Sequence, residues 1–505
     1  MLNQVTRQAA VSLTRELPSR QRWLVLAIVS VALLLIVIDM TVLYTALPRL
    51  TVELSASASA KLWILNIYAL IVSGLLPGMG TLGDRVGHKR LFLCGLSIFG
   101  LASLGAACSA SPAMLIAFRA LLAVGAATMM PATLSIIRLT FADDRERAMA
   151  IGVWAAVASG GAALGPVIGG LLLEHFWWGS VFLINVPIVL AALLCGWLLL
   201  PASTPGADRP WDWIASLQAM LGLICTAYAF KELARIHPDW QAFALALAGG
   251  VAGLSLFVRR QLRSAYPLID LALFRNRMFS GAVISAIVAA AAMFGMELLF
   301  SQRLQLVLDM SPLEAGLFML PLPLAAFVAG PLCGRLLARM PALKLLSLSL
   351  FVSGIGMGAY LLAYQAAASL QLLSLALLGA GLGATVTVAS SLILQSAPAE
   401  RAGMAASVEE VSYELGSAIG VTLMSCIVSV VYAARLELPL QGVPASAGDS
   451  LDAALLVAAE LPSGLGVQLT MAARDAFDQG FVIALAAATV LLLATAWLVR
   501  QRRRN

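Results

Sequence analysis

The chain has 505 residues, of which 61% are hydrophobic and only 11% charged, and its formal net charge is +6. Soluble domains carry about 25% charged residues, so this composition excludes a soluble globular protein and indicates an all-α integral membrane protein. At about 20 apolar residues per span, the hydropathy pattern predicts fourteen transmembrane helices. The six cysteines lie singly in or beside apolar runs, so they predict neither a disulfide framework nor a metal site.

The basic residues are distributed unevenly about the predicted spans. With the N-terminus placed inside, Arg119 lies within a helix, and seven of the 32 Lys and Arg residues fall outside, namely Arg49, Lys61, Lys231, Arg235, Arg303, Arg435 and Arg474. This positive-inside pattern predicts that both termini are cytoplasmic. The net positive charge is therefore topological and does not indicate a nucleic-acid partner. Residues 1–22 form a basic tail before a long apolar helix, which predicts an uncleaved first span.

The first predicted helix, from about Trp23, carries an isolated acid, Asp39. At 1.5 Å per residue it lies about 24 Å along the helix, in the outer half of the bilayer. The second helix carries Asn66 and Tyr68 at a comparable depth. A capped helix end is the structural alternative for Asp39, but its apolar neighbours favour a functional carboxylate, since ionisable groups at this depth are costly.

The segment between the second and third predicted helices, residues 80–92, reads GTLGDRVGHKRLF and is expected to be an inward-facing loop. Glycines permit a tight turn there, and the charges can pair across an interface between helices. The residues expected to act in this segment are Gly80, Asp84, Arg85, Gly87 and Lys89.

Helices four and five carry two further signals. Arg119 on the fourth helix needs a partner or a water-filled cavity at membrane depth. The fifth helix contains GGAALGPVIGG, in which Gly161, Gly165 and Gly169 recur every fourth residue beside Pro166. That spacing predicts a narrow face on which another helix packs closely.

In this order and spacing, DMTVLYTALP, GTLGDRVGHKRLF, the Arg119 helix and GGAALGPVIGG resemble the signature motifs of the major facilitator superfamily. The last resembles the motif of its drug/proton antiporters. PLIDLALFRNRMF (267–279) and SPLEAGLFMLP (311–321) resemble the fourteen-helix branch, and SVEEVSYELGSAIG (407–420) is similar to methyl-viologen and quaternary-ammonium efflux pumps of the SmvA and QacA type. His88 departs from the family loop, which usually has Arg there.

An internal repeat supports an architecture of two halves. Pro77 matches Pro331, Gly80 matches Gly334, and Glu146-Arg147-Ala148 matches Glu400-Arg401-Ala402, each pair 254 residues apart. This offset exceeds six helices and accommodates eight, so two helices are expected between six-helix halves. The expected organisation is a cytoplasmic tail (1–22), an N-terminal six-helix bundle (23–200), a linker with the inserted pair (201–258), a basic cytoplasmic loop (259–277), a C-terminal six-helix bundle (278–500) with an outer hairpin loop (435–478), and a cytoplasmic tail (501–505).

Residues 407–420 place three acids in a run that otherwise reads as a membrane span. On a helix, Glu410 and Glu414 share one face, while Glu409 points about 100° away beside Tyr413. In the second half of the repeat, Glu297 replaces Asp39 after a shift of one turn. The proton- and cation-binding candidates are therefore Asp39, Glu297, Glu409, Glu410 and Glu414, with Glu410 and Glu414 central. The resemblance also implies that Asp84 docks on the N-terminal end of the helix carrying 409–414, which favours a negative partner.

Motifs for other energy sources are missing from the sequence, which has neither GxxxxGK[ST] nor HExxH. An ion gradient with titratable membrane acids remains, because burial favours the neutral form of a carboxyl group and lets it hold a proton. Aromatic rings attract cations through their π faces. The candidate cavity residues are Tyr44, Trp63, Asn66, Tyr68, Trp154, Phe294 and Tyr413.

The sequence therefore predicts a proton-coupled antiporter that exports lipophilic mono- and dicationic drugs, biocides and dyes across the bacterial inner membrane. Its expected partners are cationic small molecules, protons and membrane lipid; it needs no cofactor or metal, is no enzyme, and is expected to be a monomer. Two alternatives stay open. An exporter of another metabolite would need several basic residues at the midplane, where only Arg119 is offered, and a non-transporting sensor would leave the paired acids without purpose.

Two peripheral segments carry weaker signals. The inserted pair has no acid or glycine-rich motif in its spans and is expected to lie away from the pathway, followed by a basic segment that can track anionic headgroups. The outer segment 435–478 carries six acidic and two basic residues. It is either a solvated hairpin or an acidic shield that acts on released cations or holds helices together.

Overall fold

The computed structural model describes residues 18–141, 143–201, 212–233, 239–265, 267–337, 339–396, 402–436 and 443–502. Every regular element in these ranges is helical, which confirms the predicted all-α class. Thirteen helical segments of the described chain are long and apolar enough to cross a membrane. The protein is therefore a polytopic helical membrane protein.

The helices fall into three consecutive groups along the chain. The first comprises α2 (Ser19–Glu53), α3 (Ala58–Val86), α4 (His88–Ala107), α5 (Pro112–Thr140), α6 (Asp144–His175), α7 (Ser180–Leu183) and α8 (Asn185–Leu199). The second comprises α9 (Trp213–Leu233) and α10 (Trp240–Arg263). The third comprises α11 (Arg277–Gln302) with its π-helical end η2 (Arg303–Val307), α12 (Pro312–Met319), α13 (Pro321–Leu336), α14 (Ala342–Ala363), α15 (Ala368–Gln395), α16 (Ala402–Arg435), α17 (Leu451–Glu460) and α18 (Ser463–Arg502).

Polar side chains set several helix starts. The Ser57 side chain accepts a backbone hydrogen bond at the start of α3, and Ser111 does so before Pro112 at the start of α5. At α12, Ser311 and Glu314 form a reciprocal capping box. Such caps satisfy backbone N–H groups that have no partner within the helix, so each stabilises the end at which a new span begins.

The predicted inward loop at 80–92 is largely helical. α3 continues through Gly80 to Val86, and α4 begins at His88. Only Gly87 breaks the helical path, with a φ of 98° that residues with a Cβ rarely adopt. The turn between the helices is therefore a single residue, and the predicted loop was too long because Gly80 and Gly83 are tolerated inside α3.

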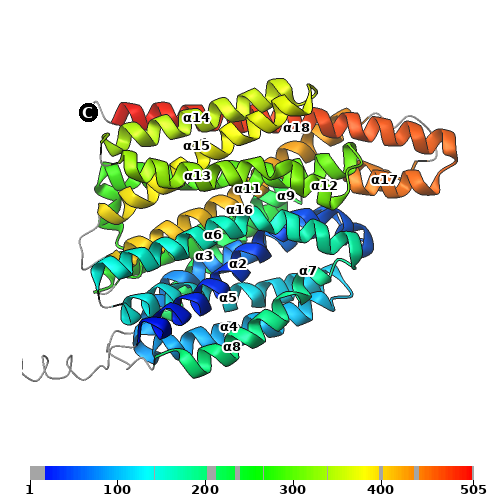
Figure 1. The fold of residues 1–505 in the computed structure, drawn as a ribbon. Coiled ribbons are helices and arrows are strands. Elements are labelled where there is room, and N and C mark those ends of the chain that lie inside the picture. Colours follow the sequence, from blue (N-terminus) through cyan, green and yellow to red (C-terminus); the bar gives the residue numbers. More distant parts are fainter. Residues whose placement is uncertain are drawn as a thin grey trace, which may run out of the picture.

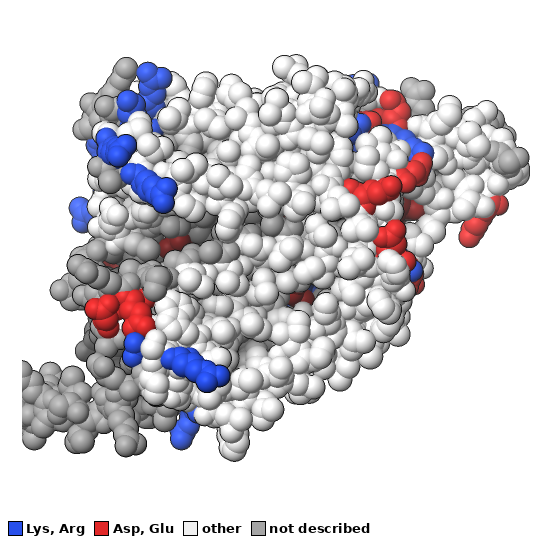
Figure 2. Space-filling view, viewed as in Figure 1, with Lys and Arg blue, Asp and Glu red and all other residues white. Residues whose placement is uncertain are grey.

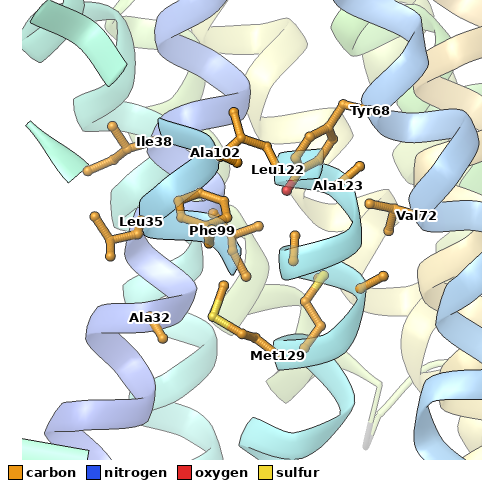
Figure 3. Packing of buried hydrophobic residues seen from close by; sticks show 14 of the residues in the cluster. Ala32, Leu35, Ile38, Tyr68, Val72, Phe99, Ala102, Leu122, Ala123 and Met129 are labelled. Carbon is orange, nitrogen blue, oxygen red and sulfur yellow. The ribbon is translucent and has the colours of Figure 1, made fainter. Parts of the chain in front are cut away.

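The first and third groups of helices each enclose a hydrophobic core (Figure 1). In the first, α2, α3, α4 and α5 interdigitate through apolar side chains including Leu35, Val72, Phe99 and Met129 (Figure 3). We call these groups the N bundle (α2–α8) and the C bundle (α11–α18). Leu298 and Val421 of the C bundle join the N-bundle core, so the two bundles pack directly on each other.

The pair α9 and α10 lies at the side of the bundles. α9 packs against α3 and touches α16, whereas α10 packs on α9. Only 6% of the most apolar stretch of α10 is buried in the structure. α10 also extends to Arg263, beyond the predicted boundary at residue 258, because basic side chains at a helix end remain solvated while the backbone stays helical.

The outer segment differs from the predicted hairpin loop. Residues 463–478 are the first turns of the 40-residue helix α18, and α17 packs beside them. In Figure 1 these two helices project beyond the right-hand end of the bundles, whereas α2 begins and α18 ends at the left-hand end. The sequence misled here because the first turns of α18 are polar enough to read as solvent-exposed loop.

The glycine stripe of α6 packs on α2. A Cβ at Gly161 would lie 2.9 Å from Leu34, one at Gly165 would lie 2.8 Å from the Cβ of Thr41, and one at Gly169 would lie 2.6 Å from Val42. These distances leave no room for a side chain, so the close approach of α6 to α2 depends on the absence of Cβ atoms. The contact lies within one turn of Asp39.

We expect Gly165→Ala to lower the free energy of unfolding by about 1–3 kcal/mol, because its methyl group would overpack against Thr41. Gly160→Ala is the matched control, since a Cβ at this position on the same helix meets nothing within 4 Å. There the better helix propensity of alanine should raise stability by about 0.5–1 kcal/mol. Unfolding of the purified variants in detergent measures both effects; equal stability of the two variants would contradict the packing assignment.

Candidate functional site

The intramembrane arginine has a carboxylate partner. The Arg119 guanidinium on α5 donates to Asp39 on α2 at 2.5 Å, and its Nε donates to the Ile64 carbonyl at 3.3 Å. The guanidinium also lies 4.7 Å from the centre of the Tyr68 ring, a cation–π contact. Arg119 is 2% and Asp39 0% exposed. Three helices of the N bundle thus converge on one buried ion pair.

Asn185 completes this cluster. Its side-chain amide donates to Asp39 at 3.5 Å and to Ser103 at 3.3 Å. A buried ion pair is stable only when hydrogen bonds satisfy the remaining polar atoms. Asp39 is therefore held between Arg119 and Asn185, and its charge is already compensated in this conformation.

Glu414 on α16 lies in a different environment. It is 4% exposed, and its Oε2 atom is buried with no hydrogen-bond partner. Glu410 and Arg119 are the charged groups within electrostatic range of it. Buried carboxylate oxygens are nearly always hydrogen-bonded. Glu414 is an exception, and its Oε2 atom is an unsatisfied acceptor at the interface of the bundles.

The other two acids of α16, Glu409 and Glu410, lie on different faces of the helix, as the helical spacing predicts. Glu410 and Glu414 both lie within electrostatic range of Tyr68 in the N bundle. Tyr413, by contrast, contacts α15: its hydroxyl is 2.9 Å from that of Ser390 and donates to the Val386 carbonyl at 3.2 Å. Glu409 also neighbours Ser390. One face of α16 thus meets the other bundle, and the other face packs within its own.

Aromatic rings line the interface near Glu297, which is half-buried on α11. The ring centres of Tyr44 and Phe294 are 6.3 Å apart, and each ring comes from a different bundle. Tyr44 lies within electrostatic range of Glu297 and Glu414. An apolar, aromatic surface with several carboxylates can hold a positively charged, lipophilic molecule.

Charges are separated along the long axis of the molecule. On the face in Figure 2, most Lys and Arg lie at the left-hand end, which also carries an acidic patch, and Asp and Glu outnumber the basic residues at the right-hand end. Acidic atoms are also visible in a hollow between the bundles towards the basic end. In the other half, hydrogen bonds join the two bundles: Ser301 donates to the Tyr44 carbonyl at 2.9 Å, and Gln305 to the Thr45 carbonyl at 3.2 Å.

Comparison with known proteins identifies the fold and family of this arrangement. The family model of the Major Facilitator Superfamily matches residues 29–421. The chain belongs to this superfamily. It is therefore a multi-pass membrane protein of a transporter family and not an enzyme.

Two relatives match this major facilitator protein over nearly its whole length. The methyl viologen resistance protein SmvA of Salmonella typhimurium (strain LT2) is 40% identical over 488 residues, covering 94% of this chain and 97% of the relative. The multidrug efflux pump LfrA of Mycolicibacterium smegmatis is 37% identical over 491 residues, covering 96% and 97%. These matches confirm the resemblance to the methyl-viologen efflux pumps.

A solved structure shares the major facilitator fold. The bacterial homologue of the human lysosomal transporter Spinster, in an inward-facing and unoccupied conformation, superposes with a TM-score of 0.69 at 18% identity. The match covers 96% of this chain and 98% of that chain. At this identity the likeness concerns the fold alone.

The remaining cavity candidates occupy several places in the major facilitator fold. Asn66 donates to Thr422 at 2.8 Å and so joins α3 to α16. Trp154 has a buried indole N–H without a partner. Trp63 packs its ring 6.2 Å from that of Tyr228 on α9, so it faces the inserted pair.

The inner motif of the superfamily contributes a clear contact through Lys89. Its ammonium donates to the carbonyls of Trp197 and Leu200 at 2.8 and 2.7 Å, which satisfies orphan carbonyls at the end of α8. Arg85 is exposed, and the side chain of Asp84 lies outside the described residues.

Sequence reasoning missed Asn185, Ser103 and Thr422 as parts of the site. Each is a single polar residue in an apolar helix, which is the signal that did identify Asn66. Small polar residues are common at helix interfaces in membranes, so this signal gains weight only when the facing side chain is known.

Proposed function

We propose that this major facilitator protein exports lipophilic mono- and dicationic compounds across the bacterial inner membrane in exchange for protons. One observation carries this proposal. At the bundle interface, the Oε2 atom of Glu414 is a buried carboxylate oxygen without a hydrogen-bond partner, while the nearby cation, Arg119, is compensated by Asp39. The unpaired charge of the site is therefore the negative charge of the ionised Glu414 carboxylate, which suits a cation.

The names of the relatives support the same class of substrate. SmvA is called a methyl viologen resistance protein and LfrA a multidrug efflux pump. Methyl viologen is a dication, and two separated positive charges can each find a carboxylate among Glu297, Glu410 and Glu414. We expect quaternary ammonium biocides and ethidium- or acriflavine-like dyes to share the pathway, since Coulombic and cation–π attraction require no fixed hydrogen-bond pattern.

Coupling follows from competition for the same acids. A cation entering from the cytoplasm binds ionised Glu410 and Glu414 against the rings of Tyr44 and Phe294. After the bundles rock, protons from outside neutralise the carboxylates and the cation leaves. Return with protons bound completes the exchange, because an unpaired carboxylate between the bundles is costly to carry through the closed states.

The other acids take secondary roles in this proposal. Asp39 and Glu297, on corresponding helices of the two halves, serve outer proton access or a second cation site. For Asp39 this requires release from Arg119, so its availability depends on the conformation of the N bundle. Glu409 neighbours Ser390 on α15 and is proposed to act from the wall of the cavity with Tyr413.

We propose fourteen spans arranged as six, two and six, with both termini cytoplasmic. The 32 residues of α6 extend about 48 Å at 1.5 Å per residue and suffice for a fourteenth span beside the thirteen segments. α2 begins and α18 ends at the basic end, which suits the cytoplasmic side (Figures 1 and 2). At that end, Asp84 is proposed to latch onto the start of α16 when the outer side opens.

The alternatives lack comparable support. An exporter of an anionic metabolite needs an uncompensated cation in the pathway. The charge of Arg119 is compensated by Asp39, to which Asn185 also donates a hydrogen bond. A sensor would have no use for a buried, unpartnered carboxylate. Both alternatives also differ from what the names of the resistance protein SmvA and the efflux pump LfrA describe.

Proton release from purified protein tests the proposal. Adding methyl viologen to protein in weakly buffered detergent solution should acidify the solution, because the cation displaces protons from the carboxyl groups. 4,4′-Bipyridine is the matched control, since it has the same ring system without the two charges. Acidification by both compounds, or by neither, would contradict competition between cation and proton at the acids.

A further inference from the structure

The outer ends of the bundles enclose a pocket outside the acidic site. From the N bundle it is lined by Leu47, Lys61, Leu62 and Leu65, and from the C bundle by residues that include Leu298, Gln302, Ser429 and Tyr432. The start of α17 closes it, since Asp449, Ser450, Leu451 and Asp452 also belong to its wall. The pocket is thus a chamber with apolar and polar walls and with acidic residues at its cover.

An ion pair in this wall joins the two bundles. The Lys61 ammonium, in the first turns of α3, donates to the carboxylate of Asp452 on α17. The side chains are only 10% and 4% exposed. The second oxygen of Asp452, Oδ1, is buried and has no hydrogen-bond partner. Asp452 therefore has one cation as its partner and capacity for a second.

Neighbouring ion pairs at this end serve a different purpose. Arg303 pairs with Asp478 at 2.8 Å, and Arg474 pairs with Asp309; all four residues belong to the C bundle. These contacts brace α18 against η2 and the turn after it. The Lys61–Asp452 pair, by contrast, spans the interface that must open if the outer side is to release a molecule.

The chamber continues the path defined by the membrane acids. On α11, Leu298 and Gln302 follow Glu297 by one and five residues, and both line the chamber. On α16, Ser429 lies fifteen residues beyond Glu414, about 22 Å towards the outer end at 1.5 Å per residue. A cation moving outward from Glu297 and Glu414 therefore reaches the chamber next.

We propose that this chamber is the exit site for organic cations and that the Lys61–Asp452 pair is its gate. The pair separates in every cycle: the Lys61 side chain swings to water, which its flexible stem permits, and Asp452 then serves as counter-charge for the departing cation. The exit site rests on the proposed export of cations, whereas opening of the gate can be measured without any substrate.

Cross-linking tests whether the pair must separate. In a cysteine-free background, Lys61→Cys/Asp452→Cys is joined by a short, reducible bis-thiol reagent in proteoliposomes. Methyl viologen transport should fall at least about tenfold below that of the same variant before cross-linking and return to that level on reduction, because a closed gate blocks release of the cation. The matched control, Asp309→Cys/Arg474→Cys, joins two residues of the C bundle and should transport as before. Full transport by the first cross-linked variant would overturn the gate.

Labelling of the chamber tests the gate independently of transport. Ser429→Cys lines the chamber and should react with a polar maleimide several-fold faster in detergent when Lys61→Met is added, because unpaired Asp452 favours the hydrated, open arrangement. The charge-free combination Lys61→Met/Asp452→Leu should return labelling to the slow rate. Equal labelling of all three proteins would refute the gate. If the labelling rates differ as expected but the unmodified protein does not transport methyl viologen, only the proposed export function is refuted.

Binding measurements test the exit site itself. Asp452→Asn should weaken binding of methyl viologen to protein held outward-open by an inner cross-link between the bundles, while binding to inward-open protein stays unchanged. Glu460→Gln, an exposed acid on the same helix, is the control for general loss of negative charge. Equal affinity of Asp452→Asn and Glu460→Gln in the outward-open form would remove Asp452 from the site.

Discussion

Replacing Glu414 with glutamine is expected to reduce proton-coupled transport of dicationic compounds by at least about 100-fold, since a neutral amide cannot exchange a proton or pair with a cation. Glutamine has nearly the same shape, so the packing of a side chain that is 4% exposed should be preserved. Transport of methyl viologen into inverted vesicles, together with proton release from purified protein, measures the loss.

A matched variant separates the position of the acid from its charge. Glu174→Gln removes an exposed carboxylate from α6 and should leave transport unchanged. Glu410→Gln should impair dicationic more than monovalent substrates, because the remaining carboxylate can still neutralise one charge. If Glu410→Gln and Glu414→Gln both retain dicationic transport and proton release, the central site is assigned to the wrong residues.

The acids themselves could be located from the sequence because charge in an apolar helix is conspicuous. Helical spacing alone separated Glu410 and Glu414 from Glu409, and the structure places Tyr413, the neighbour of Glu409, against Ser390 on α15. The all-helical class and the superfamily could be predicted from the sequence as well. These features are local or depend on composition, so periodicity and hydropathy suffice to find them.

Partners across helices could not be predicted in the same way. Arg119 required a counter-charge, but the sequence does not state that Asp39, 80 residues earlier, supplies it or that Asn185 holds both. The helix α17 and its contact with Lys61 were also missed, since pairing over 391 residues depends on the packing of both bundles. Periodicity identifies which face of a helix is polar, but only the tertiary structure identifies what that face meets.

Removing Arg119 should destabilise the protein more than removing the whole ion pair. Arg119→Met leaves Asp39 buried without a counter-charge, which is expected to cost about 3–5 kcal/mol of unfolding free energy. Arg119→Met/Asp39→Leu removes both charges and should recover most of that loss, while Asn185 keeps its bond to Ser103.

The double-mutant cycle consists of the unmodified protein, Arg119→Met, Asp39→Leu and Arg119→Met/Asp39→Leu. Denaturation of these four proteins in detergent measures the coupling between the two residues. A large coupling with transport lost in every variant would mean that the pair both stabilises the N bundle and takes part in the cycle. Transport retained by the charge-free variant would instead restrict Asp39 to a structural role and leave Glu297, Glu410 and Glu414 as the exchanging acids. Equal stability of Arg119→Met and the charge-free variant would show that Asp39 does not depend on Arg119 for its charge compensation.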